Sequence, residues 1–184
     1  MDRTLNIIHL NHREDRFQLL QNQLITTRIK TCIWPGIEDA KNPEKGIAKA
    51  HKQIVAYANH QKLPAITIAE DNILFTAPGA FDYYLKHEPE DYDLYLGSTY
   101  YGNIKEDNTI DDFAGLILYT IHQRFYKTFL SIPEEGHFDR ALAYKGKYVV
   151  CNPFVALQHN GFSDNKKKYI DYNWCMKDRE LFVR

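Results

Sequence analysis

The sequence is poor in cysteine and has no long apolar run. Its three cysteines, Cys32, Cys151 and Cys175, are widely spaced, which gives neither a disulfide framework nor a zinc-binding pattern. We expect three free thiols, as in a reducing compartment. No stretch approaches the roughly 18 apolar residues of a membrane span, and residues 1–16 lack the apolar core of a signal peptide. These absences predict a cytoplasmic protein.

An excess of either charge is also missing. The formal net charge is -1 and the pI is near 6.7, which argues against a protein that holds nucleic acid by bulk positive charge. We therefore expect no nucleic-acid partner. The G-x-G-x-x-G signature and the P-loop are absent as well, which argues against another Rossmann-like nucleotide enzyme.

The length of 184 residues fits one domain, and 44% hydrophobic residues are enough for a sizeable core. No internal repeat or low-complexity linker divides the chain. We expect a single domain over 1–184, with 158–184 as a polar tail that packs on it or stays flexible.

Short apolar runs alternate with helical patterns. Asn11 is the expected N-cap of a helix over 13–27, and the polar segment 36–45 is the expected loop before a helix over 46–60. The predicted strands are 5–10, 30–34, 65–69, 91–97, 113–120 and 147–151, and the further helices are 80–86, 121–130 and 138–144. The alternation predicts an α/β fold with a mostly parallel central sheet and helices on both faces.

The centre of the pattern is the run over 65–69, which is apolar except for Thr67 and ends at Glu70-Asp71-Asn72. It is typical of a buried strand whose carboxyl end faces the crevice where open α/β sheets bind ligands. Two carboxylates and an amide at that point are oxygen ligands of the kind that Mg²⁺ and Mn²⁺ prefer. The alternative is a strand followed by an acidic turn or a helix cap.

Two polar stretches lie outside this pattern. Lys166, Lys167 and Lys168 are most simply a solvated surface, and the alternative is a contact to phosphate or to another anionic group. The segment 98–112 is longer than most loops, and such a loop can close over a site and exclude water.

Seven segments, in order between about residues 4 and 165, resemble the motifs of glycosyltransferase family 25, the family of lipopolysaccharide-biosynthesis and collagen galactosyltransferase domains. The first three are I-H-L-N-H-R-E-D-R at 8–16, P-E-K-G-I-A-K-A-H at 43–51 and A-E-D-N at 69–72. The others are Y-D-L-Y-L-G at 92–97, G-x-x-x-Y at 115–119, D-R-A-L at 139–142 and P-x-x-x-x-Q-x-x-x-x-S at 153–163. The chain departs from the family where Asn72 replaces an acid, and where Ile47 and Ala50 replace a cysteine and a serine.

The resemblance implies a single GT-A domain, which is a Rossmann-like fold. It implies an enzyme that transfers a hexose, expected to be galactose, from a UDP-sugar to a hydroxyl of a surface-polysaccharide or lipopolysaccharide acceptor, with inversion. The partners are then a nucleotide-sugar donor and a glycan or lipid-linked glycan, which allows peripheral association with a membrane. The rival interpretation, which Asn72 favours, is a non-catalytic GT-A-like module that binds a nucleotide or glycan.

The motif positions also imply roles for single residues. The expected donor-binding residues are Asn11, Arg16, Gly46, His51, Glu70 and Asp71. Glu70 and Asn72 are expected to hold Mn²⁺ or Mg²⁺, which would neutralise the departing diphosphate, and His159, which follows the last strand without a family counterpart, is a further candidate ligand. With Asn72 in place of an acid, the amide oxygen ligates, or the metal binds weakly, or no metal is needed.

An inverting transfer needs a base, and Asp139 matches the family's late acidic position. His137 and His159 are the runners-up. Each of these assignments has a structural alternative: Arg13 and Arg16 can hold diphosphate or pair with Glu14 or Asp15, His51 can be a core histidine, Asn72 a turn residue, and Asp139 a helix cap or a partner of Arg140.

Overall fold

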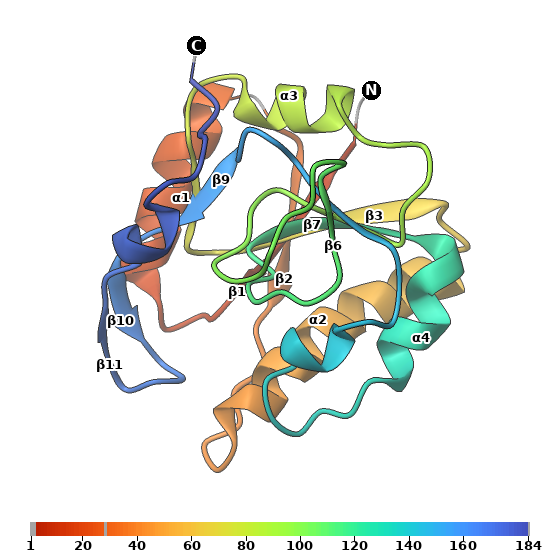
Figure 1. The fold of residues 1–184 in the computed structure, drawn as a ribbon. Coiled ribbons are helices and arrows are strands. Elements are labelled where there is room, and N and C mark those ends of the chain that lie inside the picture. Colours follow the sequence, from red (N-terminus) through yellow and green to blue (C-terminus); the bar gives the residue numbers. More distant parts are fainter. Residues whose placement is uncertain (1–2, 28, 184) are drawn as a thin grey trace.

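The computed structural model describes residues 3–27 and 29–183, which build a seven-stranded sheet (Figure 1). In spatial order the strands are β2 (Thr31–Pro35), β1 (Leu5–His9), β3 (Ala65–Glu70), β7 (Leu118–His122), β5 (Leu94–Leu96), β8 (Tyr148–Val150) and β6 (Thr109–Ile110). Only β7 and β6 run against the other five, because both pair antiparallel with their neighbours. The predicted mostly parallel central sheet is confirmed.

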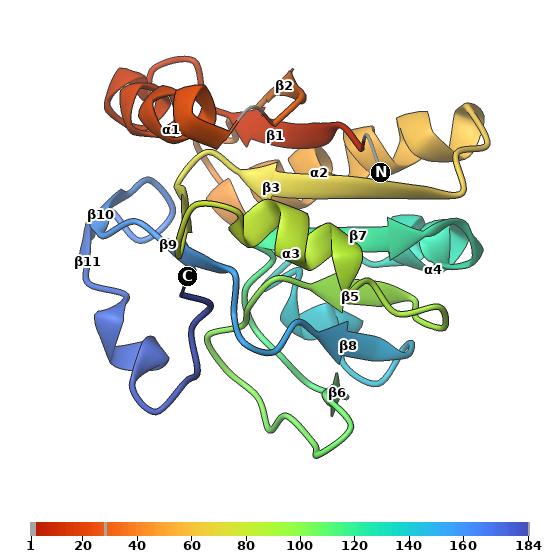
Figure 2. The same ribbon diagram turned by 90° about the horizontal axis from the view of Figure 1, so that it is seen from above.

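Helices cover both faces of this sheet, as predicted (Figure 2). On one face lie α1 (Glu14–Thr27) and α3 (Ala80–Lys86), and on the other lie α2 (Pro43–His60) and α4 (Tyr126–Ser131). The helix over 80–86 begins and ends where the sequence placed it.

The central strand β3 is buried on both faces. Ile66 and Ile68 pack in the apolar layer beneath α2 and α4, while Ala69 packs in the layer beneath α1 and α3. Thr67 is fully buried, and its hydroxyl lies 2.8 Å from the hydroxyl of Thr120, so neither group loses its hydrogen bond. Burial on both faces explains why this strand shows no alternation of polar and apolar residues.

Helix α2 begins three residues before the predicted start at Gly46, so the expected loop over 36–45 is shorter. The side chain of Asn42 accepts a hydrogen bond from the backbone N–H of Lys45 at 3.2 Å, and Pro43 occupies the first turn. This start places Glu44 in the first turn. Gly46 lies under the preceding loop, where a Cβ atom would come within 2.3 Å of the carbonyl oxygen of Ile37.

The prediction that Asn11 caps the first helix is wrong. Asn11 and His12 form a turn, and α1 begins only at Glu14. The backbone N–H of Arg13 donates to the carbonyl of Leu10 at 2.8 Å, which closes this turn. The extra turn leaves Asn11 exposed and brings Arg16 into the first turn of the helix.

The boundaries in the middle of the chain also differ from the prediction. The apolar run over 113–120 forms a strand only from Leu118, because a uniformly apolar segment carries no period that marks its limits. The predicted helix over 121–130 is a 3₁₀ turn, Gln123–Phe125, followed by α4, and the predicted helix over 138–144 is one 3₁₀ turn, Arg140–Leu142.

The C-terminal part contains three strands that the sequence did not reveal. β9 (Ala156–Gln158) pairs with β4 (Ile73–Phe75), and β10 (Gly161–Ser163) and β11 (Lys168–Ile170) form a hairpin, followed by a 3₁₀ helix, Asn173–Met176. The expected polar tail is therefore packed structure over its described residues. Among the described helices, none combines the length and apolar character that a membrane crossing requires.

Candidate active site

A cavity of about 590 Å³ opens at the carboxyl ends of β1 and β3. One side consists of Glu70 at the end of β3, the two residues after it, Asp71 and Asn72, and His51 of α2 and Arg16 of α1. We call these five residues the strand wall. The expectation that the carboxyl end of the central strand faces a crevice is confirmed.

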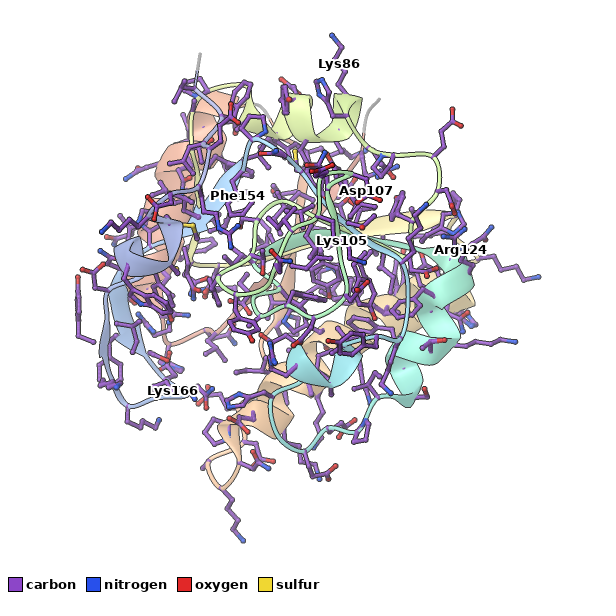
Figure 3. All side chains as sticks on the ribbon, in the orientation of Figure 1. Lys86, Lys105, Asp107, Arg124, Phe154 and Lys166 are labelled. Carbon is purple, nitrogen blue, oxygen red and sulfur yellow. The ribbon has the colours of Figure 1, made fainter. Side chains whose placement is uncertain are left out.

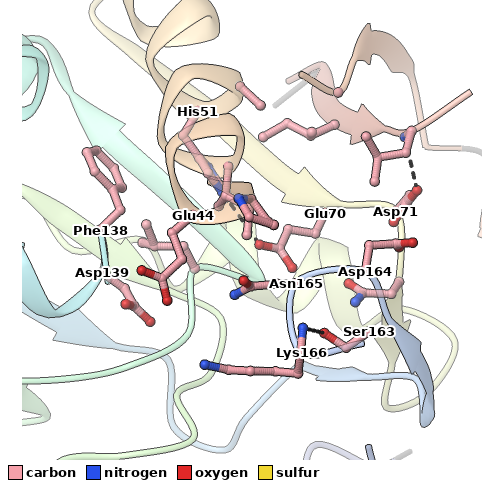
Figure 4. Close-up of a pocket in the computed structure, with 18 of the residues that line it drawn as sticks. Glu44, His51, Glu70, Asp71, Phe138, Asp139, Ser163, Asp164, Asn165 and Lys166 are labelled. Carbon is pink, nitrogen blue, oxygen red and sulfur yellow. Dashed lines mark hydrogen bonds and ion pairs between the residues drawn. The ribbon is translucent and has the colours of Figure 1, made fainter. Parts of the chain in front are cut away.

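The turn of the β10–β11 hairpin forms another side of the cavity. We call its residues Ser163, Asp164, Asn165, Lys166 and Lys167 the hairpin wall. Figure 4 shows Glu44, Asp139, Asn165 and Lys166 arranged around the same space.

The cavity carries more carboxylates than fixed cations. Its acidic lining residues are Glu38, Asp39, Glu44, Glu70, Asp71, Asp139 and Asp164, and its lysine and arginine residues are Arg16, Lys166 and Lys167. A diphosphate that enters such a cavity is repelled unless it binds beside these three cations or brings a cation of its own. Two of the three cations, Lys166 and Lys167, thus come from the lysine run that the sequence most simply predicts to be a solvated surface.

Asp71, a residue of the strand wall, is held in place by three neighbouring residues. Its side chain is 4% exposed, and Oδ2 lies 2.8 Å from Nδ1 of His9 and accepts a hydrogen bond from the backbone N–H of Leu10 at 3.4 Å. Its Oδ1 accepts from Nη1 of Arg16 at 3.1 Å. The carboxylate thus joins β1, β3 and α1, and it orients Arg16.

The two arginines of the first motif have different surroundings. Arg13 donates to Asp15, to Asp164 at 2.6 Å and to the carbonyl of Phe162, so its guanidinium holds the hairpin. Arg16 donates to Asp71 and to the same carbonyl at 3.0 Å, and its side chain, 17% exposed, lines the cavity. Arg16 therefore remains the better candidate for contact with a diphosphate.

His51 joins the strand wall to the core. Its Nδ1 lies 2.9 Å from the hydroxyl of Tyr119 on β7, and its Nε2 lies 3.5 Å from Oε1 of Glu70. The His51 side chain is 2% exposed, whereas the Glu70 side chain is 29% exposed. His51 is thus a buried core histidine and also lies next to the carboxylate that faces the cavity.

Asn72 carries a buried polar atom without a partner. The residue is 5% exposed, and its Oδ1 has no hydrogen bond within the described chain. Such an orphaned acceptor is rare in folded proteins, and it can accept a hydrogen bond or act as an oxygen ligand. The backbone carbonyl of Asn72 is satisfied, since it accepts from the N–H of His159 at 2.8 Å.

His159 lies outside the main cavity. It lines a neighbouring space of about 30 Å³, which suits a water molecule. Its Nε2 lies 3.3 Å from the side-chain nitrogen of Gln23, and burial lowers its pKa. The structure therefore does not bring His159 together with Glu70 around one open space.

Glu70 and Asn72 line the same cavity, and their side chains carry oxygen atoms, the ligand type that a cation shared with a diphosphate would take. Such a cation needs only one or two protein ligands beside phosphate oxygens and water. A closed protein site is not formed, because no group of three or more His, Cys, Asp or Glu side chains in residues 3–27 and 29–183 could hold a metal ion.

Asp139 lies in the cavity lining and also caps the 3₁₀ turn after it. Its Oδ1 accepts from the backbone N–H of Arg140 at 2.9 Å, and its Oδ2 accepts from the N–H of Gly115 at 2.8 Å. Gly115 has φ of +108°, a backbone conformation that favours glycine, and a Cβ atom there would lie only 3.0 Å from the ring of Tyr100. The predicted cap is thus present, and the carboxylate joins two loops at the cavity.

Two predicted donor-binding residues do not line the cavity. Asn11 lies in the exposed turn after β1, and Gly46 is buried beneath the loop that precedes α2.

The long segment 98–112 is anchored by β6 and by a bridge between Tyr101 and Ala114. Its residue Tyr100 lines the cavity.

His12, for which the sequence predicted no role, joins two sides of the cavity. Its Nδ1 lies 3.1 Å from Glu38 on the loop before α2, and its Nε2 lies 3.3 Å from Asp164 on the hairpin wall. Hydrogen bonds to Asp164 and then Glu38 raise its pKa. The sequence does not show this contact, because His12, Glu38 and Asp164 lie far apart in the chain and meet only in the fold.

A second cluster of charges lies far from the cavity, at the opposite end of the sheet. Figure 3 shows Arg124 on the other side of the molecule from Lys166. Arg124 pairs with Asp91 and Asp93, and hydrogen bonds from Lys147 and Arg124 lower the pKa of Asp91 to about 2. These exposed pairs satisfy one another and stabilise the surface only slightly.

Comparisons with known proteins reveal relatives only at the level of structure. No protein-family model matches the chain, and the search of curated proteins gave no match. A197 from STIV aligns with a TM-score of 0.52 and 16% identity over 99% of this chain and 98% of its own.

Two further solved structures are comparably similar. The inositol-1-phosphate CTP transferase from T. maritima has a TM-score of 0.53 and 10% identity, over 84% of this chain and 87% of its own. A glycosyltransferase involved in glycosylation of the major capsid of PBCV-1 has a TM-score of 0.51 and 10% identity, over 83% and 82%. At these identities the likeness shows a Rossmann-like fold shared with nucleotidyl- and glycosyltransferases, while membership of glycosyltransferase family 25 stays a prediction.

Proposed function

We propose that the protein is a glycosyltransferase that uses a nucleotide sugar. The observation that carries the proposal is the strand wall, because Arg16, Glu70 and Asn72 line one cavity at the carboxyl end of the central strand. This is the place where open α/β sheets bind nucleotides. The shared fold and the sequence motifs support the same conclusion.

The donor is proposed to lie with its diphosphate between Arg16 and Glu70. Arg16 is held by Asp71, so its guanidinium is oriented before the donor binds. Glu70 and the free Oδ1 of Asn72 would hold Mn²⁺ or Mg²⁺, which neutralises the departing diphosphate when bound.

The remaining details of the reaction rest on the family resemblance. We propose a UDP-hexose donor, with galactose as the sugar, and an inverting transfer to a hydroxyl of a surface-polysaccharide or lipopolysaccharide intermediate. Asp139 is the proposed base, since it lies in the cavity lining. An acceptor on a lipid carrier would bring the protein to the cytoplasmic face of a membrane.

The test is thermal unfolding with a panel of nucleotides and nucleotide sugars, each with Mn²⁺ or with chelator. A ligand at about 100 times its dissociation constant stabilises the fold by about 2.7 kcal/mol. A shift with one UDP-sugar supports the proposal and identifies the donor, and dependence of that shift on Mn²⁺ supports the cation. Absence of a shift with every nucleotide would contradict the proposal.

The second candidate is a GT-A-like module that binds a nucleotide or glycan without turnover. Two observations favour it: an amide stands at Asn72, and Asp71 is occupied by His9, Leu10 and Arg16. The candidates differ in UDP release, which a transferase produces from its donor with acceptor or water and a binding module does not.

A further inference from the structure

The side chains of Tyr119, His51 and Glu70 form a connected path from the core to the cavity. Tyr119 and His51 are buried, and Glu70 at the end of the path is partly exposed. The path runs from the hydroxyl of Tyr119 to Nδ1 of His51 at 2.9 Å, and from Nε2 of His51 to Glu70 at 3.5 Å. We infer that Tyr119 is a positioning residue, which fixes the proton of His51 on Nε2 and thereby holds the Glu70 carboxylate toward the ligand. This inference rests on the proposed function of the cavity.

The sheet register brings these groups together. Tyr119 on β7 lies directly beside Ile68 on β3, and Glu70 lies two residues further along β3 on the same face of the sheet. That face packs against α2, which carries His51. The three side chains therefore belong to three rigid elements, and rigid elements hold a site more accurately than loops do.

The surroundings determine which group donates. Tyr119 is fully buried, and burial raises the pKa of its hydroxyl well above the ordinary value, so the hydroxyl keeps its proton. Within the described chain, Nδ1 of His51 is the acceptor that this hydroxyl meets. A hydroxyl that donates to Nδ1 leaves the ring proton on Nε2.

The opposite tautomer would be unfavourable at both ends of the path. With its proton on Nδ1, the ring would leave the buried hydroxyl of Tyr119 without an acceptor. It would also turn the lone pair of Nε2 toward Oε1 of Glu70, where two electron-rich atoms would repel each other. The ring cannot easily turn away, because it stacks on Phe138 with a centroid distance of 6.3 Å and an interplanar angle of 15°.

The consequence concerns the two oxygens of Glu70. An N–H on Nε2 attracts Oε1, so Oε2 is left for a cation or for a hydroxyl of the donor. Groups that orient a ligating side chain from behind typically change affinity 10- to 100-fold when they are removed. Tyr119 would act in this way without touching the ligand.

The first experiment measures the tautomer of His51 in the whole protein. Long-range proton–nitrogen spectra of histidine-labelled protein report which ring nitrogen carries the proton, and loss of one signal set in H51Q assigns it. We expect the proton on Nε2 in the native protein and a mixture of tautomers in Tyr119→Phe. A proton on Nδ1, or an unchanged tautomer in Tyr119→Phe, would overturn the inference.

The second experiment measures UDP affinity by titration calorimetry, with Mn²⁺ and with chelator. Tyr119→Phe should weaken UDP binding about tenfold. Tyr84→Phe is the matched control, because Tyr84 is also fully buried and its hydroxyl lies 2.7 Å from the carbonyl of Tyr95, on the opposite face of the sheet. It should change UDP affinity by less than about twofold, and equal losses in the two variants would reject a specific role for Tyr119.

A double-variant cycle separates orientation from packing. His51→Gln keeps an N–H donor near the position of Nε2 and has no tautomer to fix, so adding Tyr119→Phe to it should cost little further affinity. An equal cost of Tyr119→Phe in both backgrounds would show that the tyrosine acts by packing alone. If the native protein binds no UDP, the proposed function fails, whereas the tautomer spectra still test the inference.

Discussion

The two walls of the cavity are held in different ways. On the strand wall, Asp71 and His51 are almost completely buried and connected to neighbouring elements through hydrogen bonds. On the hairpin wall, Lys166 and Lys167 are exposed, and Asp164 is held by Arg13 and His12. Buried, connected groups keep their geometry before a ligand binds, while exposed lysines lose side-chain entropy when they bind one.

This difference suggests a division of roles. The strand wall is preorganised for one part of the ligand, which we propose to be the diphosphate and its cation. The hairpin wall has weaker ties and can adjust to the rest of the ligand. Substitutions around the cavity test this division.

Asp139→Asn tests whether chemistry takes place between the walls. If Asp139 is the base, turnover should fall by about 10²- to 10⁴-fold, while UDP affinity stays within about tenfold, or 1.4 kcal/mol. The measurements are UDP release and UDP titration. Retained turnover would exclude Asp139 as the base. Its role would then be structural, because it accepts hydrogen bonds from the backbone of Gly115 and Arg140.

Asp71→Asn tests whether the strand wall is structural as well as functional. The substitution breaks a buried pair with Arg16 and His9, which should lower the free energy of unfolding by about 3–5 kcal/mol. Denaturant unfolding measures this loss. Glu70→Gln is the matched control, since its side chain is partly exposed, and it should change stability by less than about 1 kcal/mol. Similar losses in the two variants would contradict the distinction between these neighbouring acids.

Lys166→Ala tests the hairpin wall. An exposed lysine that contacts a phosphate contributes about 0.5–1 kcal/mol at low salt, so UDP affinity should fall two- to fivefold. The loss should shrink as salt concentration rises. Lys86→Ala is the control, because Lys86 lies on α3, away from the hairpin wall (Figure 3). An equal effect of both variants would show that only the total charge matters.

His12 gives the smallest expected effect, which depends on pH. Hydrogen bonds to Asp164 and Glu38 raise its pKa in the folded state above the ordinary value of 6.5, with Arg13 and Arg16 also facing Asp164. Its contribution to stability is therefore complete below about pH 6.5 and is lost as pH rises through the raised pKa. Hydrogen exchange of the β10–β11 amides, compared with His12→Gln between pH 5.5 and 8.5, should show this loss only in the native protein. If the ratio of the exchange rates of the two proteins stays constant across that pH range, the contact is contradicted.

The sequence predicted the parts that depend on an apolar run with a clear polar end. The run over 65–69 is too apolar for a loop, and the polar Glu70-Asp71-Asn72 after it marks the crevice, so the central strand and the strand wall were predictable. The start of α2 was also present in the sequence, since Asn42-Pro43 is a common helix start, but the polar composition of 36–45 favoured a loop.

Other parts depend on contacts that the sequence does not display. His51 and Tyr119 are 68 positions apart, and they meet because α2 packs on the face of the sheet that carries Tyr119. The β10–β11 hairpin has strands of three residues, too short for a periodic pattern, and it is fixed by Arg13 and Arg16 bonding to the carbonyl of Phe162. Neither contact leaves a local signal in the chain.

We propose that the strand wall binds the diphosphate of a nucleotide sugar. The most direct test is titration calorimetry of UDP-galactose, with Mn²⁺, into the native protein and into Glu70→Gln. We expect one binding site in the native protein and an affinity lower by about 100-fold, or 2.7 kcal/mol, in the variant. Absence of binding to the native protein, or equal affinity for both proteins, would contradict it.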